Sequence, residues 1–185
     1  RKGVHYSTLE LGKEDMKFSA AHYTVFSATE RERLHGHTHV VRVQLTGPVA
    51  ADGMIANYAL FKTRVRELCK KWDETYLVPG NSEHIKVEFK EGASDAGKVC
   101  ITHNGLTQEL PADDVRVLPV TNVTLEELSM LLLHELVGEA PAGEGSWAES
   151  HEIIAVTVKV SSDGGRGQWA STSWSMERGF GCPVY

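Results

Sequence analysis

Three histidines, His22, His35 and His37, have the spacing of a metal site. In a β-strand, residues i and i+2 point to the same face, so His35 and His37 can present two imidazoles to one ion, and His22 can supply a third from a paired strand. Three neutral histidines leave one position of a tetrahedral Zn²⁺ open, which is the arrangement of a catalytic site rather than a structural one. The alternative is that His22 is a hydrogen-bonded core histidine and that the pair is the polar start of a strand.

The length and composition are those of one globular domain, residues 1–185. The net charge of -6 at pH 7 excludes a general nucleic-acid binder, because no basic surface is available to neutralise phosphates. No apolar run approaches the roughly 20 residues that span a bilayer, and no signal-peptide pattern is present, so we expect no membrane partner. The 3 cysteines form no C-x-x-C pair, which fits a reducing compartment, and we expect the protein to be cytoplasmic.

Two segments have the signals of amphipathic helices. Asn57 is a suitable N-cap for a helix that runs to about Trp72. Its apolar side chains fall on one face, at Phe61, Val65, Leu68 and Trp72. The second helix begins with a capping box, in which Thr124 is the N-cap and Glu127 the N3 residue, and runs to about Leu136 before a glycine-rich stretch.

Alternating and β-branched runs predict strands around these helices. The predicted strands are 4–11, 15–21, 37–46, 85–89, 99–103, 153–160 and 169–176. The fourth and fifth form a hairpin around a turn at 92–97, and the last pair meets across a turn at 163–165. The order ββ, α, β insertion, α, ββ indicates an α+β fold, with both helices on one face of an antiparallel sheet and an insertion at about 81–120.

Several short motifs give the chain its resemblance to a known family. In order, they are Phe18-Ser-Ala-Ala-His22, Leu34-His-Gly-His37, Gly53-Met-Ile-Ala-Asn57, Trp72-Asp-Glu-Thr-Tyr-Leu77 and Thr124-Leu-Glu126. Together they resemble the 6-pyruvoyl-tetrahydropterin synthase family, which includes the 6-carboxy-tetrahydropterin synthases of queuosine biosynthesis. The resemblance covers roughly residues 5–165.

This resemblance implies a fold, a metal and a substrate class. The family has the tunnelling fold, and its subunits form homo-oligomers through their sheets, typically a hexamer built as a dimer of trimers. Zinc is held by three histidines, which match His22, His35 and His37 here. The substrate is a small pterin-like molecule, usually 7,8-dihydroneopterin triphosphate, on which zinc acts as a Lewis acid while a general base moves protons.

The general base differs from that of the familiar members, in which a cysteine precedes the H-G-H motif. Here Glu32 lies three residues before His35. This E-x-x-H-G-H spacing resembles a subgroup that cleaves the side chain to give 6-hydroxymethyl-dihydropterin, so we interpret Glu32 as the base. The alternative is a solvated charged loop, in which Glu30 and Glu32 alternate with Arg31 and Arg33.

Two further family features are changed. The Asp-His pair that assists the base from a neighbouring subunit is Asp73-Glu74 here, and both carboxylates are second-rank catalytic candidates. The glutamate that anchors the pterin ring has no counterpart within 158–165, where Asp163 is either a shorter substitute or part of a plain turn.

Other residues are predicted to line the substrate pocket. The helix start Thr124, Leu125 and Glu126 offers free backbone N–H groups to a polar ring edge, although Glu126 could simply favour the helix dipole. His39 continues the strand face of the histidine pair and is read as pocket lining, because a fourth histidine would close the zinc. The remaining histidines have no partner spacing and are treated as incidental: His5, His84, His103, His134 and His151.

The sequence therefore predicts a zinc-dependent carbon-oxygen or carbon-carbon lyase that acts on a dihydropterin or a related heterocycle. The products considered are 6-hydroxymethyl-dihydropterin and 6-carboxy-tetrahydropterin. Two alternatives follow from the changed residues: a non-catalytic, metal-stabilised oligomer that binds a ligand, and an enzyme of the same fold with a non-pterin substrate.

Overall fold

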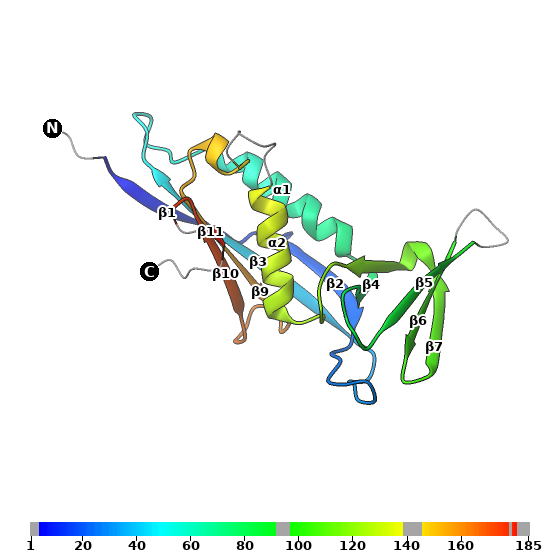
Figure 1. Cartoon of the computed structure of the whole chain (residues 1–185). Coiled ribbons are helices and arrows are strands. Elements are labelled where there is room, and N and C mark those ends of the chain that lie inside the picture. The colour runs from blue at the N-terminus through cyan, green and yellow to red at the C-terminus, as the bar shows by residue number, and fades with distance from the viewer. Residues whose placement is uncertain (1–3, 92–96, 139–145, 178, 181–185) are drawn as a thin grey trace.

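The computed structural model describes residues 4–91, 97–138, 146–177 and 179–180 (Figure 1). The strands are β1 (Tyr6–Leu11), β2 (Lys17–His22), β3 (His35–Pro48), β4 (Thr75–Pro79), β5 (Lys86–Lys90), β6 (Lys98–His103), β7 (Leu106–Pro111), β8 (Val115–Leu118), β9 (Ala155–Ser161), β10 (Ala170–Ser175) and β11 (Gly179–Phe180). The helices are α1 (Tyr58–Trp72) and α2 (Leu125–Val137). The predicted α+β class is confirmed, and β4, β7, β8 and β11 are additional strands. Neither of these helices has the length and apolarity needed to cross a bilayer.

The longest strand, β3, organises the main sheet. Along one edge, residues 40–46 of β3 pair with β9; along the other, residues 35–40 pair with β2 and residues 43–48 with β1. All of these pairs are antiparallel, as predicted. β4, however, runs parallel to both β2 and β8. The chain reaches β4 through β3 and α1, and it reaches β8 through β5, β6 and β7; such long crossovers permit parallel pairing. The prediction of a wholly antiparallel sheet is therefore wrong at this end.

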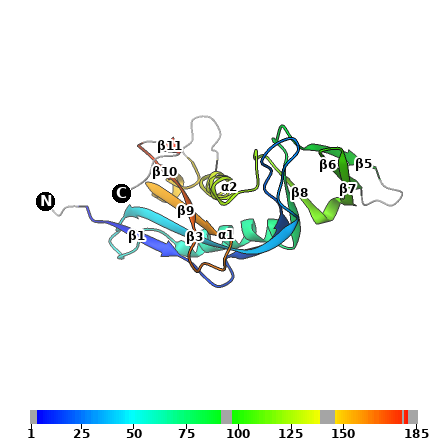
Figure 2. The same cartoon turned by 90° about the horizontal axis from the view of Figure 1, so that it is seen from below.

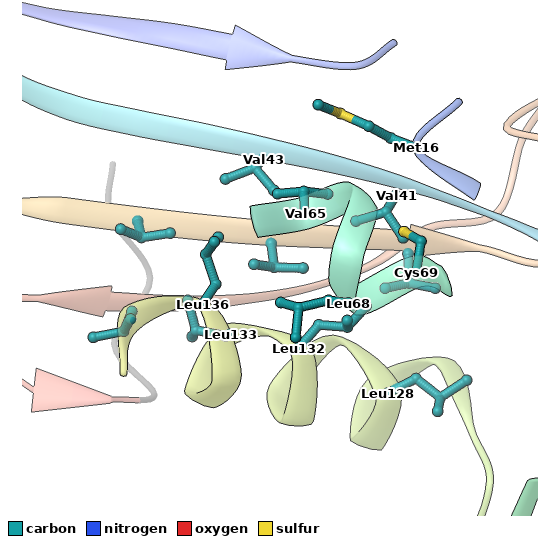
Figure 3. Close-up of a cluster of buried hydrophobic side chains, with 14 of the residues drawn as sticks. Met16, Val41, Val43, Val65, Leu68, Cys69, Leu128, Leu132, Leu133 and Leu136 are labelled. Atoms are coloured by element: carbon teal, nitrogen blue, oxygen red, sulfur yellow. The ribbon is translucent and has the colours of Figure 1, made fainter. Parts of the chain in front are cut away.

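Both helices cover the same face of the main sheet, as predicted (Figures 1 and 2). The predicted apolar stripe of α1 is buried there. Figure 3 shows Val65 and Leu68 of α1 and Leu132, Leu133 and Leu136 of α2 in one cluster with Val41 and Val43 of β3. Each fully buried aliphatic side chain contributes about 1.5–3 kcal/mol. This core fixes the position of β3, and with it the histidine-bearing start of that strand.

The helix ends use the predicted capping residues. The side chain of Asn57 accepts a hydrogen bond from the amide two residues later at 3.2 Å, and the Thr124 hydroxyl accepts one from the Glu127 amide at 3.4 Å. The Glu127 carboxylate accepts from the amide of Thr121 at 3.0 Å rather than from the N-cap amide, so the capping box is only half formed. α2 ends at Gly138, whose φ of 73° favours glycine.

The insertion forms a second antiparallel sheet, β5–β6–β7, at one end of the molecule (Figure 1). The predicted hairpin of β5 and β6 is confirmed, and its predicted turn at 92–97 lies almost wholly outside the described residues. A small core joins this sheet to β4 and to the loop after β2; it contains Tyr23, Val25, Tyr76, Val78, Ile85, Val99, Ile101 and Val115. The insertion is thus packed against the loop that connects β2 to β3.

Candidate metal centre and its cavity

The three predicted metal ligands meet where β2 ends and β3 begins. His22 is directly opposite His35 in the antiparallel register, and Ala20 is opposite His37. Each histidine offers one ring nitrogen, and these three atoms all lie within 4.8 Å of one another. The pairing of the two strands therefore creates a three-histidine site on the face of the sheet that the helices cover.

Hydrogen bonds orient two of the three rings. His22 donates from Nδ1 to the carbonyl oxygen of Val123 at 3.0 Å, and His35 donates from Nδ1 to the carbonyl oxygen of Arg33 at 2.8 Å. A neutral imidazole that donates from Nδ1 keeps a lone pair on Nε2. The Nε2 atom of His22 is buried without a hydrogen-bond partner among the described residues. Three neutral imidazoles suit Zn²⁺, and outer partners such as these two carbonyls fix the orientation of the rings, so the donor set fits the predicted metal.

The site favours the neutral forms of His22 and His37. Burial lowers the pKa of His22, and the neighbouring imidazoles of His35 and His37 lower it further. Burial also lowers the pKa of His37. Since only deprotonated imidazole nitrogen binds a metal, the lowered pKa values keep these ligands available at neutral pH.

A cavity of about 220 Å³ adjoins the three histidines. It brings together the predicted base and the predicted pocket residues from four separate parts of the chain. Its lining consists of His22, Thr24, Glu32, His35, His37, His39, Val123, Thr124, Leu125, Glu126, Leu128, Ser162 and Gln168. The N-cap and first turn of α2 form one wall of the cavity.

Glu32 is held in place by Thr24, which lies two residues after β2. Its Oε2 atom accepts a hydrogen bond from the backbone amide of Thr24 at 2.9 Å. Bonds from the hydroxyl and amide of Thr24 lower the pKa of Glu32 below its usual value, and His35 adds to this. The carboxylate is therefore ionised at neutral pH and can accept a proton. Its loop neighbour Glu30 is exposed and lies outside this cavity.

Asp73 and Glu74 lie away from the cavity of their own chain. Asp73 follows α1, and its carboxylate accepts a hydrogen bond from the amide of Ser19 at 2.7 Å. Glu74 has a φ of 56° and donates its amide to the carbonyl oxygen of Ser19 at 2.7 Å. Glu74 lines a second, open hollow whose lining also includes residues 36–38 of β3, among them His37.

The turn between β9 and β10 contributes residues that the sequence analysis missed. The Asp163 carboxylate accepts hydrogen bonds from the Ser161 hydroxyl and from the amides of Arg166 and Gln168 at 2.9 and 3.1 Å. These bonds hold the pKa of Asp163 far below its usual range. Asp163 thus organises its own turn, whereas Ser162 and Gln168 line the cavity. No motif marks these two, because only the turn brings them to the site.

Asn122 is a further residue that the sequence analysis missed. Its side-chain oxygen accepts from the backbone amide of Val25 at 3.1 Å, and its side-chain nitrogen donates to the Val25 carbonyl oxygen at 2.8 Å. The next residue, Val123, supplies the carbonyl that orients His22. The segment before α2 therefore positions both a predicted metal ligand and the loop that carries Glu32.

The chain is similar to known proteins over most of its length. The model of the family described as 6-pyruvoyl tetrahydropterin synthase matches residues 11–165. A protein of Methanocaldococcus jannaschii, provisionally named 6-carboxy-5,6,7,8-tetrahydropterin synthase, is 28% identical over 122 residues, which are 65% of this chain and 71% of that protein.

Solved structures share the fold. The crystal structure of 6-pyruvoyl tetrahydropterin synthase from Plasmodium vivax has a TM-score of 0.79 and 23% identity, covering 93% of this chain and 99% of that one. A variant of the same Plasmodium vivax protein, in which alanine replaces a glutamate described as a catalytic residue, gives a TM-score of 0.79 and 22% identity over 93% and 99% of the two chains. The tunnelling fold expected from the motifs is therefore confirmed.

Proposed function

Because the chain belongs to the 6-pyruvoyl tetrahydropterin synthase family, we propose that it is a zinc-dependent lyase acting on 7,8-dihydroneopterin triphosphate or a related dihydropterin. The observation that carries this proposal is that three histidines, Glu32 and the first turn of α2 share one cavity. A lyase that breaks a carbon-oxygen or carbon-carbon bond of the substrate side chain needs a polarising group and a proton acceptor close together. The cavity offers both.

The metal would be held by His22, His35 and His37. When bound, Zn²⁺ would supply Lewis-acid polarisation of the substrate's side-chain oxygens. The backbone carbonyls of Val123 and Arg33 keep two of the rings in the required tautomer and orientation. The protein's own contribution is therefore a set of neutral, pre-oriented imidazoles.

Glu32 is the proposed proton acceptor. Its carboxylate is charged at neutral pH, and the Thr24 amide holds one of its oxygens. It would take a proton from the substrate side chain, and the protonated form would return that proton later. The glutamate described as a catalytic residue in the Plasmodium vivax protein supports this role by analogy. The E-x-x-H-G-H spacing of this chain, which resembles that of the subgroup with this product, favours 6-hydroxymethyl-dihydropterin as the product.

A 6-carboxy-tetrahydropterin product is the second candidate. It is favoured by the name of the Methanocaldococcus jannaschii relative, which aligns with 65% of this chain. In either case Thr124, Leu125 and Glu126 would contact the heterocycle, since they line the cavity, and the buried His39 would form part of the cavity wall. The Glu126 carboxylate would accept hydrogen bonds from ring N–H groups, the task of the glutamate that is absent from 158–165.

The active form is proposed to be a homo-oligomer, a hexamer built as a dimer of trimers. In the described part of the chain, β10 pairs with β11 only at Trp174 and Ser175, so the rest of its outer edge has no strand partner. An open edge of this kind is normally paired or covered. Asp73 and Glu74, which lie away from their own cavity, would then serve a neighbouring subunit. Sedimentation analysis tests the hexamer directly; a monomer at micromolar concentration contradicts it.

Product analysis tests the function. Zinc-loaded protein is incubated with 7,8-dihydroneopterin triphosphate, with His35→Ala as the metal-free control, and the products are identified by mass spectrometry. A 6-hydroxymethyl product supports Glu32 as the base, and a 6-carboxy or 6-pyruvoyl product supports the lyase but places the base elsewhere. Absence of turnover by the zinc-loaded protein refutes this substrate.

A non-catalytic relative or a non-pterin substrate would explain a negative result. The observation that favours these alternatives is that Asp163 is engaged by its own turn and cannot replace the missing anchor. Thermal unfolding distinguishes a non-catalytic pterin-binding protein from an enzyme with another substrate, because a ligand that binds only the folded state raises the melting temperature. A shift with a dihydropterin but no turnover indicates a binding protein, and no shift at all indicates another substrate.

A further inference from the structure

His103 connects the inserted sheet to the loop that carries Glu32. It is the last residue of β6, its side chain is buried, and its Nε2 atom donates a hydrogen bond to the carbonyl oxygen of Ser27 at 2.9 Å. The turn that follows, Asn104-Gly105, has φ values of 50° and 73°, as in a type I′ hairpin. This tight turn places His103 at the tip of the β6–β7 hairpin, beside the β2–β3 loop (Figures 1 and 2).

The β2–β3 loop is itself a small hairpin. The amide of Glu32 donates to the carbonyl oxygen of Thr24 at 2.9 Å, and the amide of Phe26 donates to that of Glu30 at 3.0 Å. A β-bridge between Val25 and Arg31 lies between these bonds. These bonds couple the side of the loop that leaves β2 to the side that returns to β3. A displacement of residues 25–27 therefore also displaces Glu32.

The loop has two anchors on the side that leaves β2, and open space lies beside its returning side. Asn122 binds both backbone polar groups of Val25 near its start, and His103 binds Ser27 farther out. Between the loop and the β6–β7 turn lies a hollow of about 330 Å³, lined by Thr29, Glu30, Arg31, Glu32, Arg33, His103, Asn104 and Leu106. Side chains do not fill this space, so the His103 hydrogen bond contributes directly to the position of the outer loop.

We infer that the inserted sheet positions the catalytic base, and that His103, acting through Ser27, is the positioning residue. His103 does not line the metal cavity. Its effect is on the placement of the Glu32 carboxylate, and a misplacement of about 1 Å can cost about 100-fold in rate. This inference rests on the proposed function, because it takes Glu32 as the base.

The test compares three variants with the wild-type protein. His103→Phe keeps a buried ring but removes the N–H donor, whereas His103→Gln keeps a donor of similar reach. His84→Phe is the matched control, because His84 belongs to the same insertion but contacts Glu83 instead of the loop. Zinc content, kcat and KM for 7,8-dihydroneopterin triphosphate, and amide hydrogen exchange of residues 23–34 are measured for each.

We expect His103→Phe to lower kcat at least 10-fold with little change in KM or zinc content, and to speed amide exchange in the loop. His103→Gln should recover most of the rate, and His84→Phe should match the wild type. A zinc-loaded His103→Phe protein with normal kcat overturns the inference, and so does a loss of zinc, which would mean that His103 supports the metal site. If His103→Phe does not fold, His103→Asn, whose amide is too short to reach Ser27, replaces it with the same expected loss.

The inference and the proposed function fail in different ways. If Glu32→Gln has no turnover while His103→Phe is normal, only the positioning role is refuted. If Glu32→Gln retains full turnover, Glu32 is not the base and both are refuted. The Glu32→Gln protein is therefore assayed beside the His103 variants.

Discussion

The imidazole of His39 stacks on the ring of Phe18, with centroids 4.6 Å apart and planes inclined by 12°. The two residues are directly opposite each other on β3 and β2. His39 is 1% exposed, and its Nδ1 atom has no hydrogen-bond partner among the described residues. The ring therefore acts as an aromatic packing group whose protonation the interior opposes.

We expect replacement of His39 by phenylalanine to remove a pH dependence of stability. Burial lowers the pKa of His39 to about 3, whereas an unfolded histidine titrates near 6.5. As the pH falls from about 6.5 toward 3, the unfolded chain takes up a proton that the folded chain refuses, so stability decreases. Between pH 7 and 5 the free energy of unfolding should fall by about 2 kcal/mol because of His39.

Urea unfolding at the two pH values, with a chelator present, measures this effect. Between pH 7 and 5, the free energy of unfolding of His39→Phe should decrease by about 2 kcal/mol less than that of the wild type. His84→Phe, which replaces a partly exposed histidine, serves as the control and should behave like the wild type. Equal pH slopes for the wild type and His39→Phe would show that His39 does not carry the effect.

The paired hydrogen bonds of Asn122 should be visible in both stability and activity. Asn122→Ala leaves the amide and the carbonyl of the buried Val25 unpaired, which should lower the free energy of unfolding by about 2 kcal/mol and reduce turnover through the Glu32 loop. Chemical denaturation and steady-state kinetics measure the two effects. Asn81→Ala, an exposed matched control, should change stability by less than about 0.5 kcal/mol; an equally mild Asn122→Ala would contradict the anchoring role.

Removing one of the three histidines should abolish zinc binding. We expect purified wild-type protein to hold about one zinc per chain and His35→Ala to hold almost none, since two imidazoles do not complete the site. Metal analysis after dialysis measures the content. His84→Ala is the control and should keep its zinc. Stoichiometric zinc in His35→Ala would remove His35 from the ligand set.

Glu32 and its neighbour Glu30 allow a sharp comparison. Glu32→Gln keeps a side-chain oxygen for the Thr24 amide but cannot accept a proton, so we expect zinc to stay bound and turnover to fall at least about 100-fold. Glu30→Gln changes an exposed carboxylate of the same loop and should retain full activity. Single-turnover assays on both variants decide the matter: equal activity would assign both residues to a solvated loop.

Much of the site could be predicted because its residues are close in sequence or in strand register. The H-x-H spacing places His35 and His37 on one strand face whatever the rest of the fold, and the pattern around His22 predicted a neighbouring strand. The apolar stripe of α1 and the N-caps Asn57 and Thr124 are likewise local signals, and the structure confirms them.

Other parts of the site could not be predicted, because they depend on contacts between distant segments. Gln168 reaches the cavity only because Asp163 binds its amide and shapes the turn. His103 has no partner spacing in the sequence, yet it meets Ser27 across 76 positions of the chain. β7 and β8 lack strong alternation and are strands because neighbouring strands supply their hydrogen-bond partners.

The sequence by itself determined the candidate chemistry, namely the three histidines and the glutamate before them, and also the two helices and the family to which the chain belongs. Periodicity and short motifs encode these features, since they depend only on neighbours along the chain. The tertiary structure alone decided which residues share the cavity, which carboxylates lie away from it, and which side chains hold the Glu32 loop. These are decided by strand register and by packing between segments far apart in sequence, which no local pattern specifies.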